Sequence, residues 1–347
     1  MTLRRVVPAL LVVAGGALTA LAGCGSETPA ATGPAAKALG SAGSITVYSG
    51  QHQQTVGALV QEFQNRTGIE VHVRSSDEAD LANQLIQEGS SSPADVFFAE
   101  NPPALAALDA KHLLSAVKPT TLAAVPRQDS SPSGHWVGVS ARAAALAYNT
   151  QAVAAKDLPA SVLDLGQPAF KGKVGVAPSE TDFQPVVTRV AGDKGHDAAA
   201  QWLSGLKDNA KVYDSNESLI AAVNSGEVAM GMVDHYYWYR LRDEIGPGAI
   251  HSALHHFPST DAGGLVDIAG VAVLASSQHQ DLAQRFVAYL VSEPAQQIIA
   301  TSESFEYPLL AGVSNRRLPP LAQLTNPVVD LGTGQEALDL LQQAGML

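Results

Sequence analysis

The sequence predicts an α/β protein with two lobes, and two observations support this fold class. Between residues 45 and 99, strand-like and helical patterns alternate as β-α-β-α-β, the order typical of a parallel sheet covered by helices. From about residue 137 a second set of strands and helices follows, and the two sets share no repeat of short fixed period. A chain of 347 residues is long enough for two hydrophobic cores, so each set is expected to form one lobe.

The first set combines three strands and two helices. They are expected, in order, at 45–50, 55–68, 69–74, 80–89 and 94–99. The run 55–68 (TVGALVQEFQNRTG) gathers its apolar residues on one helical face. In 69–74 the apolar residues Ile69, Val71 and Val73 alternate with polar ones, which predicts a strand with one buried face.

The second set has a similar alternation. Strands are expected at 137–150, 173–178, 229–234 and 270–275, and helices at 218–228 and 280–292. Each lobe should therefore hold a parallel or mixed sheet with helices on both faces. Ligands of such sheets bind outside the carboxyl ends of the strands, so we expect the ligand cleft between the lobes.

The N-terminal segment has the form of a secretory signal. Arg4 and Arg5 precede an uncharged apolar run that closes with Leu-Ala-Gly before Cys24, the sole cysteine of the chain. This junction resembles the lipobox of bacterial lipoproteins, whose cysteine is lipidated and becomes the first mature residue. We expect a signal peptide at 1–23, lipidation at Cys24 and no disulfide within the chain. Residues 24–44 are small, polar and rich in Pro and Gly, which predicts a flexible tether to the membrane.

Charge and motif content exclude several function classes. The chain carries 21 basic and 33 acidic side chains, a formal net charge of −12, which disfavours nucleic acid and anionic lipid as partners. The sequence contains no P-loop, no G-x-G-x-x-G and no G-x-S-x-G motif. An exported hydrolase is therefore the weaker alternative, and we do not expect an enzyme.

Polar residues follow three of the predicted strands at their carboxyl ends. His52 follows the first strand, and Glu100 follows the third. Asp234, Tyr236 and Tyr237 come at the end of the strand with sequence AMGMVD. Each of them could serve alone in a turn, a loop or aromatic packing. Their joint occurrence at equivalent places predicts one shared site in the cleft.

Imidazole, carboxylate and two phenols form an unusual ligand set for most metals. Zinc favours Cys and His, and calcium and magnesium favour carboxylate and carbonyl oxygens. A phenol has a reference pKa of about 10, so only a strongly acidic cation displaces its proton at neutral pH. Ferric iron fits this demand, because two phenolates and one carboxylate would neutralise its charge and a neutral histidine would fill a fourth position.

The same stretches resemble the ferric-ion-binding proteins of bacterial ABC iron importers, the so-called bacterial transferrins, from about Ile45 to the C-terminus. The resemblance is carried by the motifs VYSGQH, PADVFFAEN, AAVNSGEVAMG and DHYYWYR. It implies a two-lobed periplasmic-binding-protein fold of the second type, with His52, Glu100, Tyr236 and Tyr237 as ligands of Fe³⁺.

The resemblance also implies that a synergistic anion, carbonate or phosphate, or water completes the coordination of iron. The expected anion contacts are Ser140, the backbone of Ala141, Arg142 and Asn216. This chain has Asp234 where many family members have Asn, and such an extra carboxylate would repel phosphate.

One further segment differs from part of the family. Residues 177–185 (APSETDFQP) lack the third tyrosine that some subfamilies use. Glu180 and Asp182 in this segment, like Asp234, are left open as contributors to the site.

The function that the resemblance implies is capture of Fe³⁺ outside the cytoplasm and its delivery to an ABC transporter permease. The protein is expected to act as a monomer held at the cell membrane by its lipid anchor, on the outer face or in the periplasm. The expected N-terminal lobe comprises 45–140 and 267–315, and the expected C-terminal lobe comprises 141–266 and 316–347.

Two alternatives remain open at this point. The same fold could bind an organic solute, such as a sugar, a polyamine or thiamine, with Tyr236, Tyr237 and Trp238 stacking on it and no metal present. His251 and His255 have the i, i+4 spacing of a helical metal site, but nearby prolines and a glycine favour a surface loop there.

Overall fold

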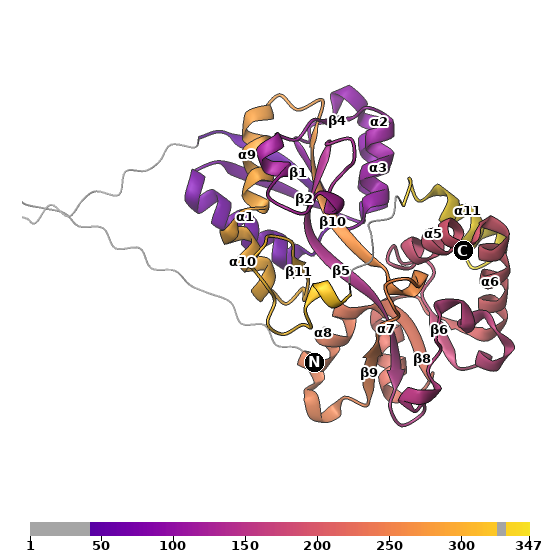
Figure 1. Ribbon diagram of the computed structural model, residues 1–347. Coiled ribbons are helices and arrows are strands. Elements are labelled where there is room, and N and C mark those ends of the chain that lie inside the picture. The colour runs from indigo at the N-terminus through magenta and orange to yellow at the C-terminus, as the bar shows by residue number, and fades with distance from the viewer. Residues whose placement is uncertain (1–41, 325–330) are drawn as a thin grey trace, which may run out of the picture. The chain divides into compact units, whose positions relative to one another are not determined.

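The computed structural model describes residues 42–324 and 331–347 (Figure 1). The predicted signal peptide, the predicted lipidation at Cys24 and nearly all of the predicted tether lie outside the described residues. In the part of the chain that the structure describes, no helix combines the length and apolar character needed to cross a membrane.

The strands follow one another in space in the order β2-β1-β3-β10-β5-β8-β6-β7, with β4 beside β10 and with β9 and β11 beside β5. Their bounds are β1 (Ser44–Ser49), β2 (Glu70–Ser75), β3 (Val96–Ala99), β4 (Leu114–Ser115), β5 (Trp136–Asn149), β6 (Val174–Val176), β7 (Ala210–Val212), β8 (Met230–Asp234), β9 (Ser252–His255), β10 (Val266–Leu274) and β11 (Tyr307–Pro308).

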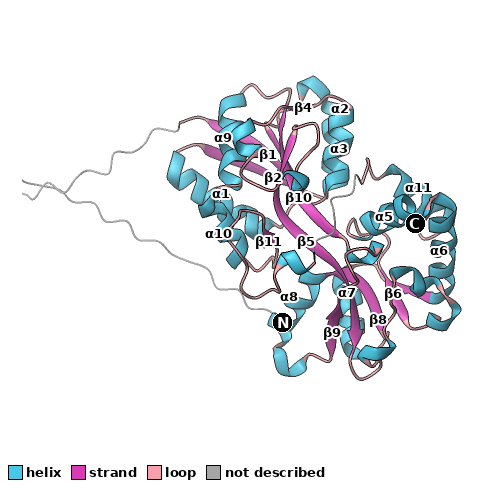
Figure 2. Ribbon diagram, viewed as in Figure 1, coloured by secondary structure: helices cyan, strands magenta, loops and turns pink. Residues whose placement is uncertain are grey.

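Strands β2, β1, β3 and β10 with the first half of β5 form the first sheet, and the second half of β5 with β8, β6 and β7 forms the second sheet. Helices cover both faces of the first sheet, with α1, α9 and α10 on one side and α2 and α3 on the other (Figure 2). The α-helices are α1 (Gln53–Thr67), α2 (Glu78–Glu88), α3 (Pro102–Ala110), α4 (Pro119–Leu122), α5 (Phe183–Lys194), α6 (His196–Asn209), α7 (Asn216–Ser225), α8 (His235–Ile245), α9 (Gln280–Leu290), α10 (Glu293–Thr301) and α11 (Gln335–Ala344).

The predicted β-α-β-α-β unit is confirmed. Strand β1 pairs in parallel with both β2 and β3, and α1 and α2 connect the three strands. Helix α1 buries Val56, Leu59 and Phe63 on one face, and it ends where Gly68 adopts the left-handed conformation with a φ of 70°. Helix α1 begins next to the carboxyl end of β1, and the candidate ligand His52 lies in the turn between them.

Strand β5 belongs to both sheets. Its residues 136–143 pair antiparallel with β10, and its residues 144–148 pair antiparallel with β8 (Figure 1). Strand β6 pairs in parallel with β7 and β8, so the second sheet is mixed. The lobe boundaries drawn from the sequence stay a prediction, because this shared strand leaves the division of the chain open.

Two hydrophobic clusters form the core, and the first of them continues from the first sheet to α7 and α8. The first packs α1, α9 and the first sheet around aromatic side chains such as Phe63, Phe97 and Phe286. The second packs α5, α6 and α11 against the second sheet, with Val187 and Leu341 fully buried. These close-packed clusters hold the strand ends in fixed positions, which a multidentate site requires.

Two expectations about individual segments are wrong. Val73 is 39% exposed, although it was expected on a buried face, because β2 is the edge strand and Val71 is its one buried residue. The HSALHH stretch contains strand β9 and is not the expected surface loop. The segment pairs antiparallel with the end of β5, so its neighbouring prolines limit the strand and do not prevent it.

Candidate metal site

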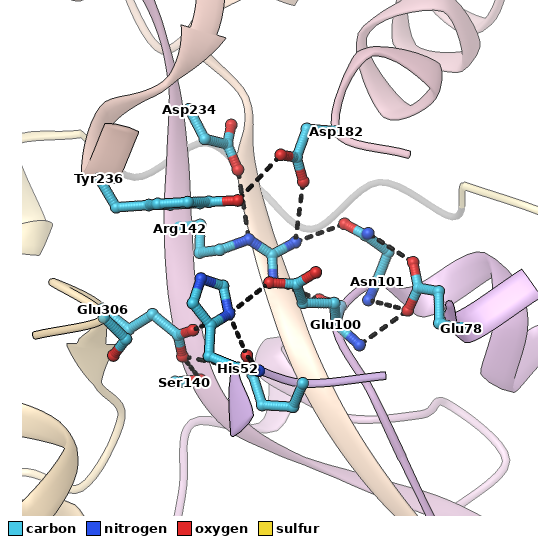
Figure 3. A network of polar contacts seen from close by, with 12 residues as sticks. His52, Glu78, Glu100, Asn101, Ser140, Arg142, Asp182, Asp234, Tyr236 and Glu306 are labelled. Atoms are coloured by element: carbon cyan, nitrogen blue, oxygen red, sulfur yellow. Dashed lines mark hydrogen bonds and ion pairs between the residues drawn. The ribbon is translucent and has the colours of Figure 1, made fainter. Parts of the chain in front are cut away.

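The four predicted metal ligands line one pocket that opens to solvent. His52 precedes the first residue of α1, and Glu100 follows β3 directly. Tyr236 and Tyr237 lie in the first turn of α8, which follows β8 without a break. Strand ends from both sheets therefore bring together side chains that are far apart in the sequence, and Figure 3 shows part of this group.

His52 and Glu100 are in direct contact. The Nδ1 atom of His52 lies 2.7 Å from Oε1 of Glu100, 2.7 Å from Oε1 of Gln51 and 3.6 Å from Oε1 of Glu306. Nδ1 of His52 is therefore the ring nitrogen that faces the carboxylate oxygens of the site.

The tyrosine pair packs against His52. The rings of Tyr236 and Tyr237 lie 4.2 Å apart, and the edge-to-face contact between His52 and Tyr236 has a centroid distance of 5.1 Å. Both hydroxyls donate to the same atom, Oδ2 of Asp182, at 3.0 Å from Tyr236 and 3.1 Å from Tyr237. Burial, and next the Asp182 carboxylate, raise the pKa of both phenols, so both are neutral in the metal-free protein.

Arg142 is fully buried at the centre of the site. Its Nε donates to Oδ2 of Asp234 at 3.2 Å, its Nη1 donates to the backbone carbonyl of Glu100 at 2.6 Å, and its Nη2 donates to Oδ1 of Asn101 (Figure 3). Burial opposes ionisation of Glu100, but the Arg142 guanidinium and then His52 outweigh it and lower the pKa of Glu100. Glu100 is therefore an ionised carboxylate at neutral pH.

The four residues expected to contact an anion have protein partners in this structure. Ser140 donates to Glu306, and Ala141 is paired within strands on both sides, with β10 and β11. Asn216, the first residue of α7, donates from Nδ2 to Asp182 at 3.2 Å. Asn216 and Arg142 thus lie close to the tyrosine pair, whereas Ser140 lies beside Glu306. Their role toward an anion stays a prediction.

The sequence did not single out Glu306. Its side chain is almost completely buried, and with His52 and Glu100 it forms a group whose ligand atoms lie within 4.8 Å of one another. Glu306 stands just before the two-residue strand β11, and so short an element gives no periodic pattern in the sequence. No sequence signal could have selected it.

Asp182 was left open by the sequence and lies at the centre of the site. It occupies the position before α5, where an aspartate usually accepts hydrogen bonds from the first turn of the helix. Its side chain makes no such bond to any described residue of α5 and points to the tyrosines instead. The direction of the Asp182 side chain is visible only in three dimensions.

The buried carboxyl group of Glu78, whose pKa is raised to about 8 by burial, supports the turn that carries Glu100. Oε2 of Glu78 accepts hydrogen bonds from the backbone N–H groups of Glu100 at 2.7 Å and of Asn101 at 2.9 Å. Oε1 of Glu78 accepts from Nδ2 of Asn101 at 2.6 Å. Gly50 lies directly against Glu78, since a Cβ at position 50 would be 2.5 Å from Cβ of Glu78. Residues 49–52 and residues 99–101 therefore both pack against Glu78.

His235 anchors the start of α8 and is not available as a ligand. Its Nε2 donates to the backbone carbonyl of Phe305 at 2.8 Å, and its Nδ1 accepts from the N–H of Ala143 at 3.2 Å. Burial lowers the pKa of His235 to about 3, so the ring is neutral and both nitrogens are used. This histidine fixes the direction in which Tyr236 and Tyr237 leave the helix.

The arrangement suits a hard cation of high charge. Glu100, His52, Tyr236 and Tyr237 line a common pocket, and the carboxyl groups of Asp182 and Glu306 contact the tyrosine hydroxyls and His52. Oxygen donors with low polarisability bind hard cations, and phenols need a strongly acidic ion to lose their protons.

Comparisons with known proteins agree with this geometry. The family of bacterial extracellular solute-binding proteins matches residues 58–323. The Fe(3+)-binding periplasmic protein of Serratia marcescens is 38% identical over 306 residues, which cover 87% of this chain and 90% of that protein. Among solved structures, iron-bound HitA from Pseudomonas aeruginosa is 40% identical with a TM-score of 0.83, and the match covers 87% of this chain and 99% of HitA.

A more distant structure has the same fold. The Trichodesmium protein IdiA, or FutA, solved in complex with iron and citrate, is 27% identical with a TM-score of 0.75 over 87% of this chain and 99% of that one. The two-lobed α/β fold of the periplasmic-binding-protein type is thereby confirmed. The chain belongs to the family of bacterial extracellular solute-binding proteins.

Proposed function

We propose that this protein captures ferric iron with His52, Glu100, Tyr236 and Tyr237 and delivers it to an ABC transporter permease. The observation that carries the proposal is that one solvent-open pocket is lined by all four side chains. The names of the relatives support it, because the Serratia protein is named for Fe(3+) binding and HitA was solved with iron.

Proton displacement gives the site its selectivity for Fe³⁺ over divalent ions. Both phenols are neutral without metal, and each must lose its proton to become a ligand. Two phenolates and the Glu100 carboxylate then balance the three charges of the ion. His52 adds an imidazole nitrogen as a fourth ligand beside Glu100.

Packing around the tyrosines argues against an organic solute that stacks on their rings. Tyr236 is 1% exposed, and its ring is in contact with Tyr237, with the edge of His52 and with the Arg240 guanidinium at 4.7 Å. A stacked sugar or thiamine needs an open ring face. The hydroxyl groups of the pair are directed at the Asp182 carboxyl group.

Delivery would follow the usual behaviour of a two-lobed binding protein. The lobes close around the ion, and acid, reduction of the iron or docking on the permease favours its release. The predicted lipid anchor at Cys24 and the tether of residues 24–44 would keep the body near the permease. No catalytic step is needed for this role.

Visible absorption tests the proposal directly, because ferric phenolate is coloured. We expect one equivalent of Fe³⁺ to give a visible band in the wild-type protein and Tyr236→Phe or Tyr237→Phe to remove most of it. Tyr239→Phe is the matched control, because Tyr239 lies on the same helix but stacks on Phe305, away from the pocket. An uncoloured wild type that binds an organic solute tightly would overturn the proposal.

A further inference from the structure

We propose that His52, Glu100 and Glu306 form a separate site for a divalent transition-metal ion, such as Zn²⁺ or Fe²⁺, which binds while both tyrosine hydroxyls keep their protons. This site goes beyond the capture of Fe³⁺, because it uses Glu306, which is outside the proposed ferric ligands, and neither phenol. It shares His52 and Glu100 with the ferric site, and two cations so close together would repel each other, so the two ions should compete.

All three side chains are carried by the first sheet. His52 lies in the turn after β1, Glu100 follows β3, and Glu306 precedes β11, which pairs with the first half of β5. The tyrosine pair, in contrast, is carried by α8, which follows a strand of the second sheet. One sheet therefore positions every ligand of the divalent site without help from α8.

The three donor atoms are spaced for one small cation (Figure 3). Nδ1 of His52 lies 2.7 Å from Oε1 of Glu100 and 3.6 Å from Oε1 of Glu306, and one ligand atom of each residue lies within 4.8 Å of the other two. Two donors bound to one ion at about 2.1 Å stand roughly 3–4 Å apart. The group is therefore close to the size that a single ion requires.

Both carboxylate oxygens of this group lack a hydrogen-bond donor. Glu306 is 1% exposed, and neither its Oε1 nor Oε1 of Glu100 accepts a hydrogen bond from the residues that the structure describes. Nδ1 of His52 is hydrogen-bonded to Oε1 of Gln51 at 2.7 Å, and a single N–H cannot serve three acceptors well. With its proton on Nε2 instead, His52 would offer the Nδ1 lone pair to a cation, and the cation would satisfy both buried oxygens at once.

The other oxygen of Glu306 is fixed by protein donors. Its Oε2 accepts hydrogen bonds from Oγ of Ser140 and, at 3.3 Å, from Nε2 of Gln51. Metal-binding carboxylates usually have such support, which leaves one oxygen directed at the ion. The turn that carries Glu100 is held in the same way by Glu78. Both carboxylates are thus in position before a metal arrives.

The donor set determines the class of ion. Two carboxylates balance two positive charges, and imidazole together with carboxylate oxygens suits Mn²⁺, Fe²⁺ and Zn²⁺. Calcium requires about six to eight oxygen donors, more than this group offers. A divalent ion is too weak an acid to displace phenol protons, so Tyr236 and Tyr237 would stay hydrogen-bonded to Asp182.

An ion can reach this group from solvent. His52 and Glu100 both line the open pocket described above. His52 also borders a second pocket, which has a volume of about 430 Å³ and lies between the start of α1 and the end of α8. Glu306 is buried behind His52, so the ion would enter past the imidazole ring.

Titration of the metal-free protein with zinc chloride tests the proposal. Calorimetry gives the affinity and the stoichiometry, and the ultraviolet difference spectrum shows whether a tyrosine ionises. We expect the wild type to bind one Zn²⁺ without a phenolate signal. Glu306→Gln should bind Zn²⁺ at least about tenfold more weakly, because loss of a ligand should cost no less than loss of a hydrogen-bond partner of a ligand.

Two control variants isolate the site. Glu303→Gln removes an exposed carboxylate from the same loop and should bind Zn²⁺ like the wild type. Tyr237→Phe should also keep the wild-type affinity for Zn²⁺, although it loses most of the visible band with Fe³⁺. Thermal unfolding without metal shows whether each variant is folded.

The outcomes separate this site from the proposed function. A folded Glu306→Gln that binds Zn²⁺ like the wild type overturns the site, and so does a wild type that binds no Zn²⁺ or ionises a tyrosine on binding it. Zn²⁺ and Fe³⁺ bound to one molecule at the same time would also overturn it. A wild type that binds Zn²⁺ as expected but gives no visible band with Fe³⁺ contradicts the proposed function and leaves the divalent site standing.

A crystallographic measurement replaces the variant if Glu306→Gln does not fold. Wild-type crystals grown with Zn²⁺ should show an anomalous peak at the zinc absorption edge, bonded to Nδ1 of His52 and to the carboxylates of Glu100 and Glu306. A peak that is not bonded to Glu306 overturns the site.

Discussion

Arg142 and Asp234 form an ion pair inside the protein, with Nε of Arg142 3.2 Å from Oδ2 of Asp234. Both side chains are essentially inaccessible to solvent. The same guanidinium lies 3.8 Å from Oε1 of Glu100 and 3.9 Å from Oδ1 of Asp182. Arg142 therefore holds carboxylates together in a place where, without it, their charges would repel one another.

Removal of this cation should destabilise the metal-free protein strongly. We expect Arg142→Met to lower the free energy of unfolding in urea at pH 7 by about 3–5 kcal/mol, because buried carboxylates are left uncompensated. Arg66→Gln, which removes a partly exposed i, i+4 pair with Glu62, should cost about 0.5 kcal/mol or less.

A double variant shows whether charge is the cause. If repulsion explains the loss, Arg142→Met combined with Asp234→Asn should be more stable than Arg142→Met alone. If the free energy of unfolding of Arg142→Met lies within about 1 kcal/mol of the wild-type value, Arg142 does not compensate the negative charge of these carboxylates.

Gly50 should be needed for close packing of the His52 turn on Glu78, the residue that holds the Glu100 turn. A methyl group at position 50 would lie 2.5 Å from Cβ and 2.9 Å from Cα of Glu78. We expect Gly50→Ala to lower stability by about 1–3 kcal/mol and to weaken iron binding, because Glu78 holds the Glu100 turn in place. Urea unfolding and iron titration measure the two effects.

Gly57 in α1 offers the matched control for this substitution. An added Cβ there meets nothing within 4 Å. Gly57→Ala should therefore raise stability by about 0.5–1 kcal/mol, as expected for alanine in a helix. If Gly50→Ala and Gly57→Ala change the free energy of unfolding equally, the close packing of Gly50 on Glu78 does not matter for stability.

His235 should make the metal-free protein sensitive to acid. Burial lowers its pKa from 6.5 to about 3, so the unfolded chain binds a proton that the folded protein does not accept. Its contribution to stability is complete above pH 6.5 and is lost as the pH falls toward 3, with a slope of up to about 1.4 kcal/mol per pH unit.

Comparison with a variant that does not titrate isolates this effect. His235→Gln should be less stable than the wild type at pH 7, and the difference should shrink as the pH is lowered to 4. His196→Gln, which alters an exposed histidine, should leave the pH profile of unfolding unchanged. A stability difference that is constant between pH 7 and pH 4 would show that His235 does not titrate as its burial implies.

Iron binding should release protons from the tyrosines. Because the pKa of both phenols is raised above its ordinary value, both are protonated before iron arrives. We expect about two protons from the phenols per ion, and apparent affinity should fall by about 100-fold per pH unit on acidification. Titration of weakly buffered protein with ferric citrate, compared with the same titration of Tyr236→Phe and Tyr237→Phe, measures these protons, and equal release from the wild type and the variants would mean that the phenols do not coordinate.

The sequence predicted the parts of the site that follow regular elements. Glu100 comes directly after β3, His52 lies in the turn between β1 and α1, and Tyr236 follows β8, so the rule for strand ends located them. Asp182 comes after a loop and Glu306 beside a two-residue strand, and neither place can be found from periodicity. The position of these two carboxylates depends on packing between segments far apart in the chain.

The fold class was predictable for a similar reason. The helices and strands of the first unit have strong apolar periodicity, and the structure confirms them. The exposure of Val73 depends on which strand lies at the sheet edge, and the pairing of β9 depends on the far end of β5. Those facts are properties of the assembled sheet and not of a local stretch of sequence.

A crystal structure of the iron-loaded protein, with anomalous diffraction measured at the iron absorption edge, tests the central claim most directly. The account predicts a single peak bonded to the hydroxyl oxygens of Tyr236 and Tyr237, with His52 and Glu100 completing the protein side of the pocket. A peak elsewhere, with both hydroxyls still hydrogen-bonded to Asp182, would contradict it.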